Sequence, residues 1–172
     1  MTGQTQVRAA GPVHRGAIEA IYSVAFPDED LLPLLRALLD GRAPVLSLVA
    51  VCGGTVVGHC LFTHCAAGGR PVALFGPLAV APARRGEGHG SALVREGLAR
   101  LTTAGAVRVC VLGDPTYYGR FGFVVERWIA TPCPIPDDWR PAWRSLALAR
   151  GSAPGGTLEV PAPWCDPALW SP

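Results

Sequence analysis

The sequence contains no lysine. All 15 of its basic residues are arginine, and 13 acidic residues nearly balance them, which leaves a formal net charge of +2. A phosphate-binding loop of the GxxxxGK[ST] type needs a lysine, so the composition excludes that loop. The small net charge and an isoelectric point of about 8.3 also argue against a nucleic-acid-binding protein, which would carry a basic stripe.

Long apolar runs are missing too. The longest one, VLSLVAVC at 45–52, is far too short to cross a bilayer, and residues 1–16 lack the apolar core of a signal peptide. Charged residues make up only 16% of the chain and hydrophobic residues 49%, which excludes a disordered chain. We therefore expect a soluble cytoplasmic protein with no membrane partner.

The six cysteines include no CxxC pair, which favours reduced, buried thiols over a disulfide framework. The segment HCLFTHC at 59–65 is the one place where histidine and cysteine gather. In a strand, Cys60 and His64 would share a face but stand about 13 Å apart, and His59 would point away from His64. We predict no metal site.

The order of apolar and turn segments indicates one α/β domain of the α+β kind, over residues 1–172, with 129–172 as a proline-rich extension packed on it. Asp28 or Asp30 is expected to cap the second helix and Gly41 to end it. Gly97 inside a helix predicts a close approach of that helix to the sheet. The expected elements are a strand at 4–10, helices within 11–26 and 31–40, a hairpin of 45–51 and 55–63, a strand at 71–80, a helix at 91–101, a strand at 106–113, a short helix capped by Asp114, a strand starting at 121, and a last hairpin of 144–150 and 156–162.

The stretch RRGEGHGS at 84–91 lies between the strand at 71–80 and the helix that follows. Glycines before a helix N-terminus let an anion approach unpaired N–H groups, and phosphate is the natural ligand. The dinucleotide fingerprint GxGxxG does not fit, because its third glycine falls on Ser91 when counted from Gly86 and on Leu93 when counted from Gly88.

The spacing R-x-x-G-x-G, formed by Arg85, Gly88 and Gly90 after LAVAP, resembles the GNAT superfamily of acyl-CoA-dependent N-acyltransferases. The order of elements read above matches that family as well. The resemblance implies a mixed, mostly antiparallel sheet that is splayed between its fourth and fifth strands and flanked by helices, with a C-terminal hairpin extension. It also implies acetyl-CoA as co-substrate. The residues implied for its pantetheine arm are Leu78, Ala79 and Val80, and those for its pyrophosphate are the backbone amides of Arg85, Gly86, Glu87, Gly88, His89, Gly90 and Ser91.

A carboxylate inside this loop would repel a diphosphate, so the side chain of Glu87 is expected to face solvent. A second signature, YYGRFGF, is similar to the Y-x-x-x-G-F of many GNAT enzymes and places Tyr118 as the general acid that protonates the leaving thiolate. Tyr117 is the weaker candidate. The longer string LGDPTYYGRFGF resembles a branch of small bacterial N-acetyltransferases, and this likeness runs from about residue 45 onward.

The function implied is an N-acetyltransferase that moves an acetyl group from acetyl-CoA to a primary amine by direct attack, with the N–H of Val80 or a neighbour polarising the thioester. A small-molecule acceptor is favoured because Trp139, Trp143 and Trp164 could wall a compact pocket, although such rings also cover cores. A protein or peptide acceptor and a non-catalytic acyl-CoA-binding module stay open, as does a homodimer.

The general base is left open between a water chain, His64 and the acidic residues Asp28, Glu29 and Asp30. An acyl-cysteine route through Cys110 is the rival mechanism, but its valine neighbours should raise the pKa of that thiol and leave it inert.

Overall fold

A computed structural model describes residues 3–172, which divide into two compact units. The first unit contains the described residues through Phe62 together with Pro77–Gly97. The second contains Thr63–Gly76 and Leu98–Pro172. Each unit is assembled from two stretches of chain, and β3 (Thr55–Ala67), β4 (Arg70–Val80) and α3 (His89–Thr103) each contribute residues to both. The expectation of one domain with 129–172 as an extension stays a prediction.

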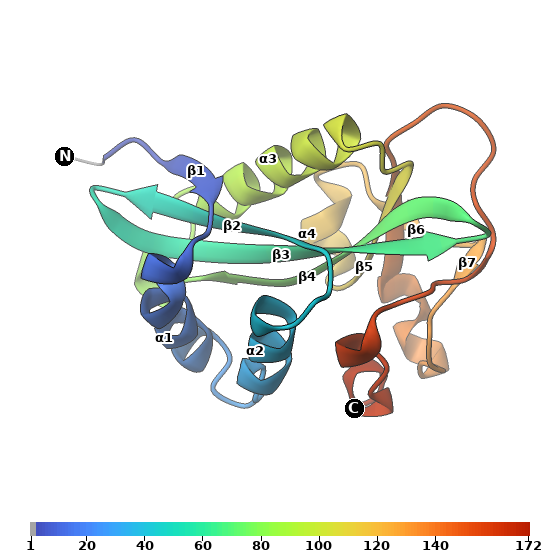
Figure 1. Ribbon diagram of the computed structural model, residues 1–172, viewed down its shortest axis with the longest axis horizontal. Coiled ribbons are helices and arrows are strands. Elements are labelled where there is room, and N and C mark those ends of the chain that lie inside the picture. Colours follow the sequence, from blue (N-terminus) through green and yellow to red (C-terminus); the bar gives the residue numbers. More distant parts are fainter. Residues whose placement is uncertain (1–2) are drawn as a thin grey trace. The chain divides into compact units, whose positions relative to one another are not determined.

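The elements follow the expected order through the short helix after Asp114 (Figure 1). None of the helices within residues 3–172 is both long and apolar enough to cross a membrane. The remaining helices and strands are β1 (Gln6–Ala9), α1 (Arg15–Ala25), α2 (Leu32–Asp40), β2 (Val45–Cys52), β5 (Arg108–Leu112), α4 (Pro115–Gly119), β6 (Val124–Val125), β7 (Ile129–Ala130), β8 (Trp143–Ala147) and β9 (Gly156–Thr157).

The sheet has the strand order β1-β2-β3-β4-β5-β8-β6. Its β4 and β5 are parallel, and β1–β2, β5–β8 and β6–β8 are antiparallel, so the predicted mixed, mostly antiparallel sheet is confirmed. The parallel register runs from Val72↔Arg108 to Phe75↔Val111. Beyond Phe75, β4 continues through Gly76, at a φ of 141°, and Pro77, which has no N–H to donate to a neighbouring strand.

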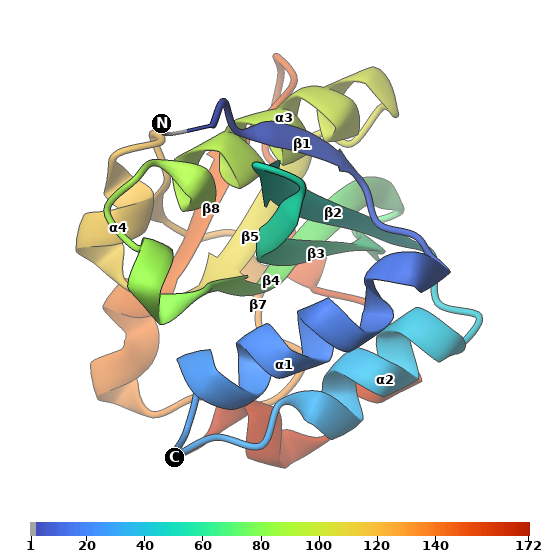
Figure 2. The same ribbon diagram turned by 90° about the vertical axis from the view of Figure 1, so that its left-hand side faces the viewer.

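In the first unit, helices cover both faces of the strands. Figure 2 shows α1 and α2 side by side against one face, while the first half of α3 lies against the other. The buried side chains of α1 and α2 recur every three or four residues, which forms one apolar stripe on each helix. They are Ile18, Ile21 and Tyr22 in α1, and Leu34, Leu35 and Leu38 in α2.

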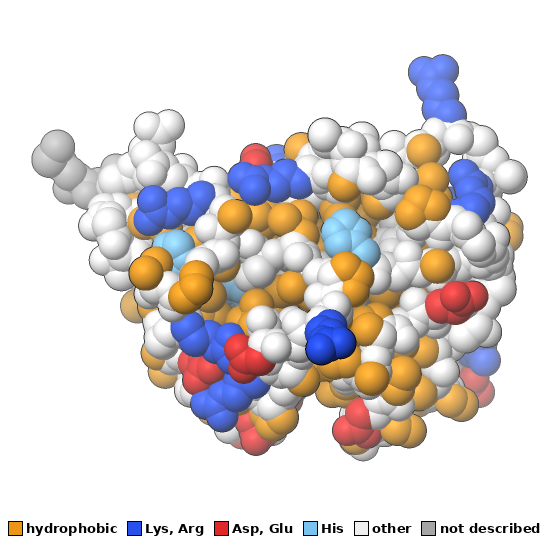
Figure 3. Space-filling view, in the orientation of Figure 1, with side chains coloured by type: hydrophobic (Ala, Val, Ile, Leu, Met, Phe, Trp, Pro, Cys, Tyr) orange, Lys and Arg blue, Asp and Glu red, His pale blue; other side chains and the backbone are white. Residues whose placement is uncertain are grey.

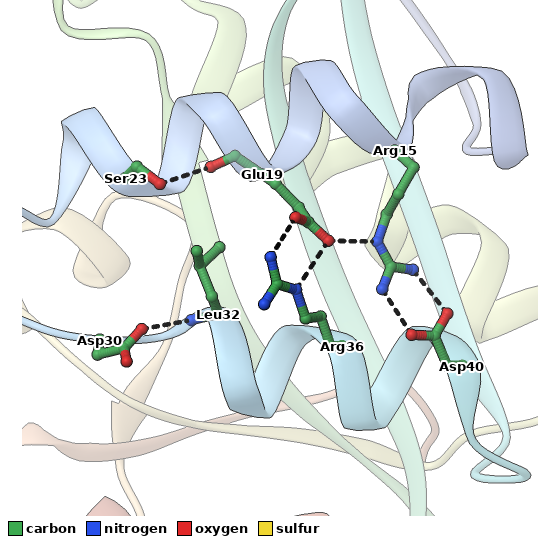
Figure 4. A network of polar contacts seen from close by, with 7 residues as sticks. All are labelled: Arg15, Glu19, Ser23, Asp30, Leu32, Arg36 and Asp40. Carbon is green, nitrogen blue, oxygen red and sulfur yellow. Dashed lines mark hydrogen bonds and ion pairs between the residues drawn. The ribbon is translucent and has the colours of Figure 1, made fainter.

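A network of ion pairs joins α1 to α2. The carboxylate of Glu19 accepts hydrogen bonds from Arg15 at 2.7 Å and from Arg36 at 2.7 Å, and Arg15 also pairs with Asp40 at 2.7 Å (Figure 4). Side chains of both charges therefore alternate on the surface over these helices (Figure 3). The predicted cap of α2 is wrong, because the N-cap residue is Leu31, which makes no side-chain cap bond; Asp30 lies one residue earlier, and its Oδ1 accepts from the N–H of Leu32 at 3.3 Å.

The predicted close approach at Gly97 is confirmed. A Cβ at this position of α3 would lie 2.1 Å from Cε2 of Phe62 on β3, both within the first unit. Glycine is the residue that allows the helix backbone to lie this close to an aromatic ring. Gly41 ends α2 as expected, and a Cβ there would lie against the carbonyl oxygen of Ala37.

The predicted last hairpin is wrong. The first predicted arm corresponds to β8. This strand pairs with β5 in the register Arg108↔Ala147 to Leu112↔Trp143, and it pairs with β6 on its other side. Its second arm is reduced to β9, which pairs in parallel with β7. The buried strand β5 requires a partner on its second edge, and β8, with Trp143 and Ser145 buried, supplies it.

The tryptophans of the C-terminal segment form a core in the second unit. Trp143 and Trp164 contact Trp170 with ring centroids 5.9 Å and 6.1 Å apart, and all three rings are buried. Each indole N–H is satisfied, with Trp164 donating to the hydroxyl of Thr63 at 3.0 Å. Core packing thus accounts for Trp143 and Trp164, while Trp139 is only half-buried.

Candidate active site

The glycine-rich loop of the first unit has the backbone that an anion cradle needs. A short 3-10 turn, Pro82–Arg84, leads from β4 into the loop, and α3 begins at His89. Gly86 and Gly88 have φ of 81° and 86°, and a Cβ on either would meet nothing within 4 Å. Left-handed backbone with open space beside it, followed by the free N–H groups of a helix N-terminus, is suited to binding phosphate.

The carboxylate of Glu87 is exposed, as expected, but it is also paired. It accepts from the guanidinium of Arg84 at 2.7 Å and lies 3.0 Å from Nε2 of His89. These bonds, that of Arg84 first, hold the pKa of Glu87 below its ordinary value. The negative charge that would oppose a diphosphate is therefore partly neutralised by Arg84.

His89, one of the predicted binding residues, has a buried ring that ties the loop to the N-terminal segment. Only 2% of the residue is exposed, and its Nδ1 lies 2.9 Å from the hydroxyl of Thr5. The ring therefore links the loop to the N-terminal segment, and its burial keeps it away from a ligand. Arg85 is exposed and donates to the carbonyl of Ala25, at the end of α1, at 3.3 Å.

The predicted pantetheine residues form the end of β4. Ala79 is buried, while Leu78 and Val80 on either side of it are half-buried. A Cβ on Gly58 of β3 would lie 3.2 Å from the carbonyl oxygen of Ala79 and 3.1 Å from Cδ1 of Leu93 in α3. The strand end and the helix that follows the loop are thus packed closely within one unit.

Tyr118 belongs to the second unit, on α4. Asp114 caps this helix as predicted, accepting from the N–H of Thr116 at 2.9 Å. The half-buried ring of Tyr118 contacts Phe75 and Phe123 edge-on, with centroids 5.6 Å and 5.7 Å apart. It also covers Gly113 so closely that a Cβ there would lie 2.4 Å from its Cε2. The ring is therefore held on several sides.

Tyr117 packs differently. The guanidinium of Arg120 lies over its ring at 4.6 Å, and Phe121 contacts it at 5.5 Å. These contacts give Tyr117 a packing role.

The candidate bases lie in different parts of the chain. Asp28, Glu29 and Asp30 are exposed and line a pocket of about 360 Å³ in the first unit, together with Tyr22 and Phe26. His64 is half-buried in the second unit.

Sequence reasoning missed a buried polar cluster in the first unit, and considered His59 only as a metal ligand. His59 is fully buried, and its Nδ1 and Nε2 lie 2.9 Å from the hydroxyl of Tyr22 and 2.8 Å from that of Ser47. Burial, and to a lesser extent the charge of Arg15, lower the pKa of His59 to about 3. A polar residue between apolar neighbours on a buried strand was the only available signal.

The rival nucleophile Cys110 is fully buried on β5, and burial raises the pKa of its thiol well above the ordinary value. Such a thiol is a poor nucleophile. Within residues 3–172 no three histidine, cysteine or acidic side chains are grouped so that they could hold a metal ion.

The sequence of this chain is similar to those of known acetyltransferases. The family model described as the acetyltransferase (GNAT) family matches residues 15–123. The uncharacterized N-acetyltransferase YjhQ of Escherichia coli K12 is 34% identical over 140 residues, which is 76% of this chain and 77% of that protein.

Two solved structures share the fold. A GNAT family acetyltransferase from Brucella melitensis in complex with acetyl-CoA is 33% identical, with a TM-score of 0.75, and the match covers 94% of this chain and 98% of that one. The E. coli N-acetyltransferase YhbS in complex with CoA is 28% identical, with a TM-score of 0.83, over 94% and 92% of the two chains. The chain belongs to the acetyltransferase (GNAT) family.

Proposed function

We propose that this protein transfers the acetyl group of acetyl-CoA to a primary amine of a small molecule. The observation that carries the proposal is the loop before α3, where Gly86 and Gly88 hold left-handed backbone with open space beside it. Relatives of this chain at 33% and 28% identity were solved with acetyl-CoA and with CoA. The amides of residues 85–91 would bind the pyrophosphate, and Leu78, Ala79 and Val80 the pantetheine arm.

In the proposed reaction the amine nitrogen attacks the thioester carbonyl carbon, and the C–S bond breaks as the tetrahedral intermediate collapses. A backbone N–H at Val80 or a neighbour would stabilise the developing oxyanion. The thiolate would then take its proton from the hydroxyl of Tyr118, and the proton that the nitrogen loses as the amide forms would return to the oxygen of Tyr118 through water. A phenol with an ordinary pKa near 10 keeps its proton at neutral pH and can give it to a sulfur anion formed beside it.

A small, cationic acceptor is favoured by the pocket at the end of α1. Its volume of about 360 Å³ suits a small molecule. Its wall carries three consecutive acidic residues, Asp28, Glu29 and Asp30, and also includes Tyr22 and Phe26. Carboxylates raise the local concentration of an ammonium ion.

The test is a thiol-release assay with acetyl-CoA against a panel of primary amines, including cadaverine and tyramine, and against peptides with a free N-terminus or an arginine-flanked lysine. Calorimetry with CoA runs beside it. We expect CoA binding and release of thiol with small amines. Release with peptides alone would establish a protein acetyltransferase, binding without release would establish a non-catalytic module, and no binding would overturn the assignment of the loop.

The acyl-cysteine alternative has its own test. Cys110→Ala should keep full turnover, because the proposed route forms no bond to sulfur of the protein. If the Cys110→Ala variant is folded and binds CoA but has no turnover, the acyl-cysteine mechanism would be supported instead.

A further inference from the structure

A chain of hydrogen bonds crosses the interior of the first unit. It begins at the hydroxyl of Ser47 on β2, which lies 2.8 Å from Nε2 of His59 on β3. Nδ1 of the same ring lies 2.9 Å from the hydroxyl of Tyr22 on α1, and that hydroxyl also donates to the carbonyl of Pro77 on β4 at 3.2 Å. Three side chains thus join β2 to β4 through the core.

Each end of this chain lies at a pocket. Tyr22 is part of the wall of the pocket with Asp28, Glu29 and Asp30, the proposed acceptor site. Ser47 lies in the wall of a separate pocket of about 550 Å³, which Arg15, Glu19 and Asp40 also line. The two residues at the ends of this hydrogen-bonded chain, Tyr22 and Ser47, therefore each contribute to the wall of a different pocket, and His59 joins them.

The Tyr22 end lies beside the predicted reacting centre. Its hydroxyl contacts Pro77, which immediately precedes the residues proposed to bind the pantetheine arm, Leu78 to Val80. An amine that attacks a thioester held on that strand segment must come close to the same part of the backbone. The hydroxyl of Tyr22 is a buried polar side-chain group that contacts this part of the backbone.

We propose that Tyr22, His59 and Ser47 form a proton relay that takes the proton from the acceptor amine and delivers it to solvent in the second pocket. This inference rests on the proposed function. It supplies the base that β4 lacks, since PVALFGPLAV contains no carboxylate. Tyr22 is the catalytic residue, and His59 and Ser47 act through it.

The step balances as a shift of four protons by one position each. The N–H bond of the ammonium breaks and its proton goes to the oxygen of Tyr22, while the nitrogen regains its lone pair. The Tyr22 proton goes to Nδ1 of His59, the Nε2 proton goes to Ser47, and the Ser47 proton goes to water. Afterwards Tyr22 donates to Pro77, which is the bond seen here. Once the product has left, the reverse shift takes one proton from water in the second pocket at Ser47 and releases one proton from Tyr22 to water in the acceptor pocket, which restores the starting state.

Burial, and to a lesser extent the charge of Arg15, keeps the ring of His59 neutral, which a concerted relay needs. The charged groups that line the two pockets are Arg15 and Glu19 on α1, Asp40 on α2, and the three acidic residues 28–30 that follow α1. Arg15 opposes a second proton on the ring, and full burial opposes it more strongly. The ring therefore passes a proton on and does not store one.

The test compares the pH profiles of kcat/KM for the wild type and Tyr22→Phe between pH 6 and 9, using the best acceptor of the amine panel. Without the hydroxyl, only amine that is already deprotonated can react. At pH 7 the variant should be slower by about 100-fold, and this deficit should shrink about tenfold with each pH unit towards the pKa of the amine itself. His59→Gln should behave in the same way, and Ser47→Ala, at the solvent end, should lose less.

Tyr117→Phe is the matched control and should keep the wild-type profile. A profile of Tyr22→Phe equal to the wild type, or lowered by one constant factor at every pH, would overturn the relay while leaving the acetyltransferase in place. No turnover by the wild type with any acceptor would overturn the proposed function and the relay with it. Nitrogen chemical shifts of His59 give a readout apart from activity: we expect a neutral ring with both nitrogens hydrogen-bonded from pH 5 to 9, and titration within that range would contradict the relay.

Discussion

The ring of Tyr118 stands edge-on to that of Phe75, with centroids 5.6 Å apart and an angle of 86° between the planes. Phe75 is the last residue of β4 that pairs with β5. The proposed acid is therefore anchored by packing at the point where the parallel pairing ends.

Tyr118→Phe keeps these ring contacts and removes only the hydroxyl, so the protein should stay folded. We expect kcat to fall by about 10²-fold, because the thiolate must then leave without a proton from the enzyme. Steady-state thiol release measures the loss, and CoA calorimetry shows whether binding is kept. Tyr117→Phe should retain wild-type kcat. Equal rates for the two variants across pH would remove Tyr118 from the mechanism.

Gly88→Ala should weaken CoA binding without unfolding the protein. The left-handed backbone at Gly88, at a φ of 86°, costs an alanine about 1–2 kcal/mol, so the loop would move to a conformation less suited to phosphate. This corresponds to a loss of about 5- to 30-fold in affinity by calorimetry. Gly105→Ala is the matched control, because Gly105 has a φ of 89°, equally open surroundings, and a place outside the loop.

Gly97→Ala should destabilise the fold by about 1–3 kcal/mol, because its Cβ would overlap the ring of Phe62 inside a packed core. Gly16, exposed on α1, has nothing within 4 Å of an added Cβ. Gly16→Ala should therefore stabilise by about 0.5–1 kcal/mol through helix propensity alone. Urea unfolding of both variants measures the change in the free energy of unfolding relative to the wild type. Changes of the same sign for the two variants would contradict the packing argument.

His59 should make stability depend on pH on the acid side of neutrality. Its pKa is about 3 in the folded protein against 6.5 ordinarily, so between these values the unfolded chain binds a proton that the folded protein does not. The free energy of unfolding should fall as pH falls through this window, by about 1.4 kcal/mol for each pH unit well below 6.5. In His59→Gln the free energy of unfolding, measured by urea titration at each pH, should fall less steeply between pH 6.5 and 5 than in the wild type.

Glu19 should make the stability of the protein depend on pH in a more acidic range than His59 does. Hydrogen bonds from Arg36 and then Arg15 lower its pKa to about 2 from 4.5, so the stability it contributes is present above pH 4.5 and is lost as pH falls towards 2. In Glu19→Gln the thermal denaturation midpoint should vary less with pH over that range. Added salt should reduce the difference in midpoint between the variant and the wild type, because the ion pairs lie at the surface. A difference that persists at 1 M salt would argue for a buried role.

Local features of the fold, and the loop that makes up the candidate site, could be predicted from short stretches of sequence. The lack of lysine excluded one class of phosphate loop, and the spacing of Arg85, Gly88 and Gly90 indicated another. The caps at Asp114 and Gly41 were predicted because each depends on the backbone within a few residues. The close approach at Gly97 is a tertiary contact, and a glycine inside a helical pattern indicated it. Apolar periodicity indicated the helices and most strands for the same reason.

Other features depended on residues far apart in the chain. The strand 143–147 pairs with β5 and β6 instead of with residues 156–157, because the exposed edge of β5 offered a partner that no local pattern reveals. The chain from Ser47 through His59 to Tyr22 likewise joins three elements separated by 12 and 37 residues. Local sequence determined the elements and the loop chemistry. Tertiary packing alone decided which strand edges pair and which buried polar groups meet. The reason is that each buried polar group needs a hydrogen-bond partner, and the fold can supply that partner from any part of the chain.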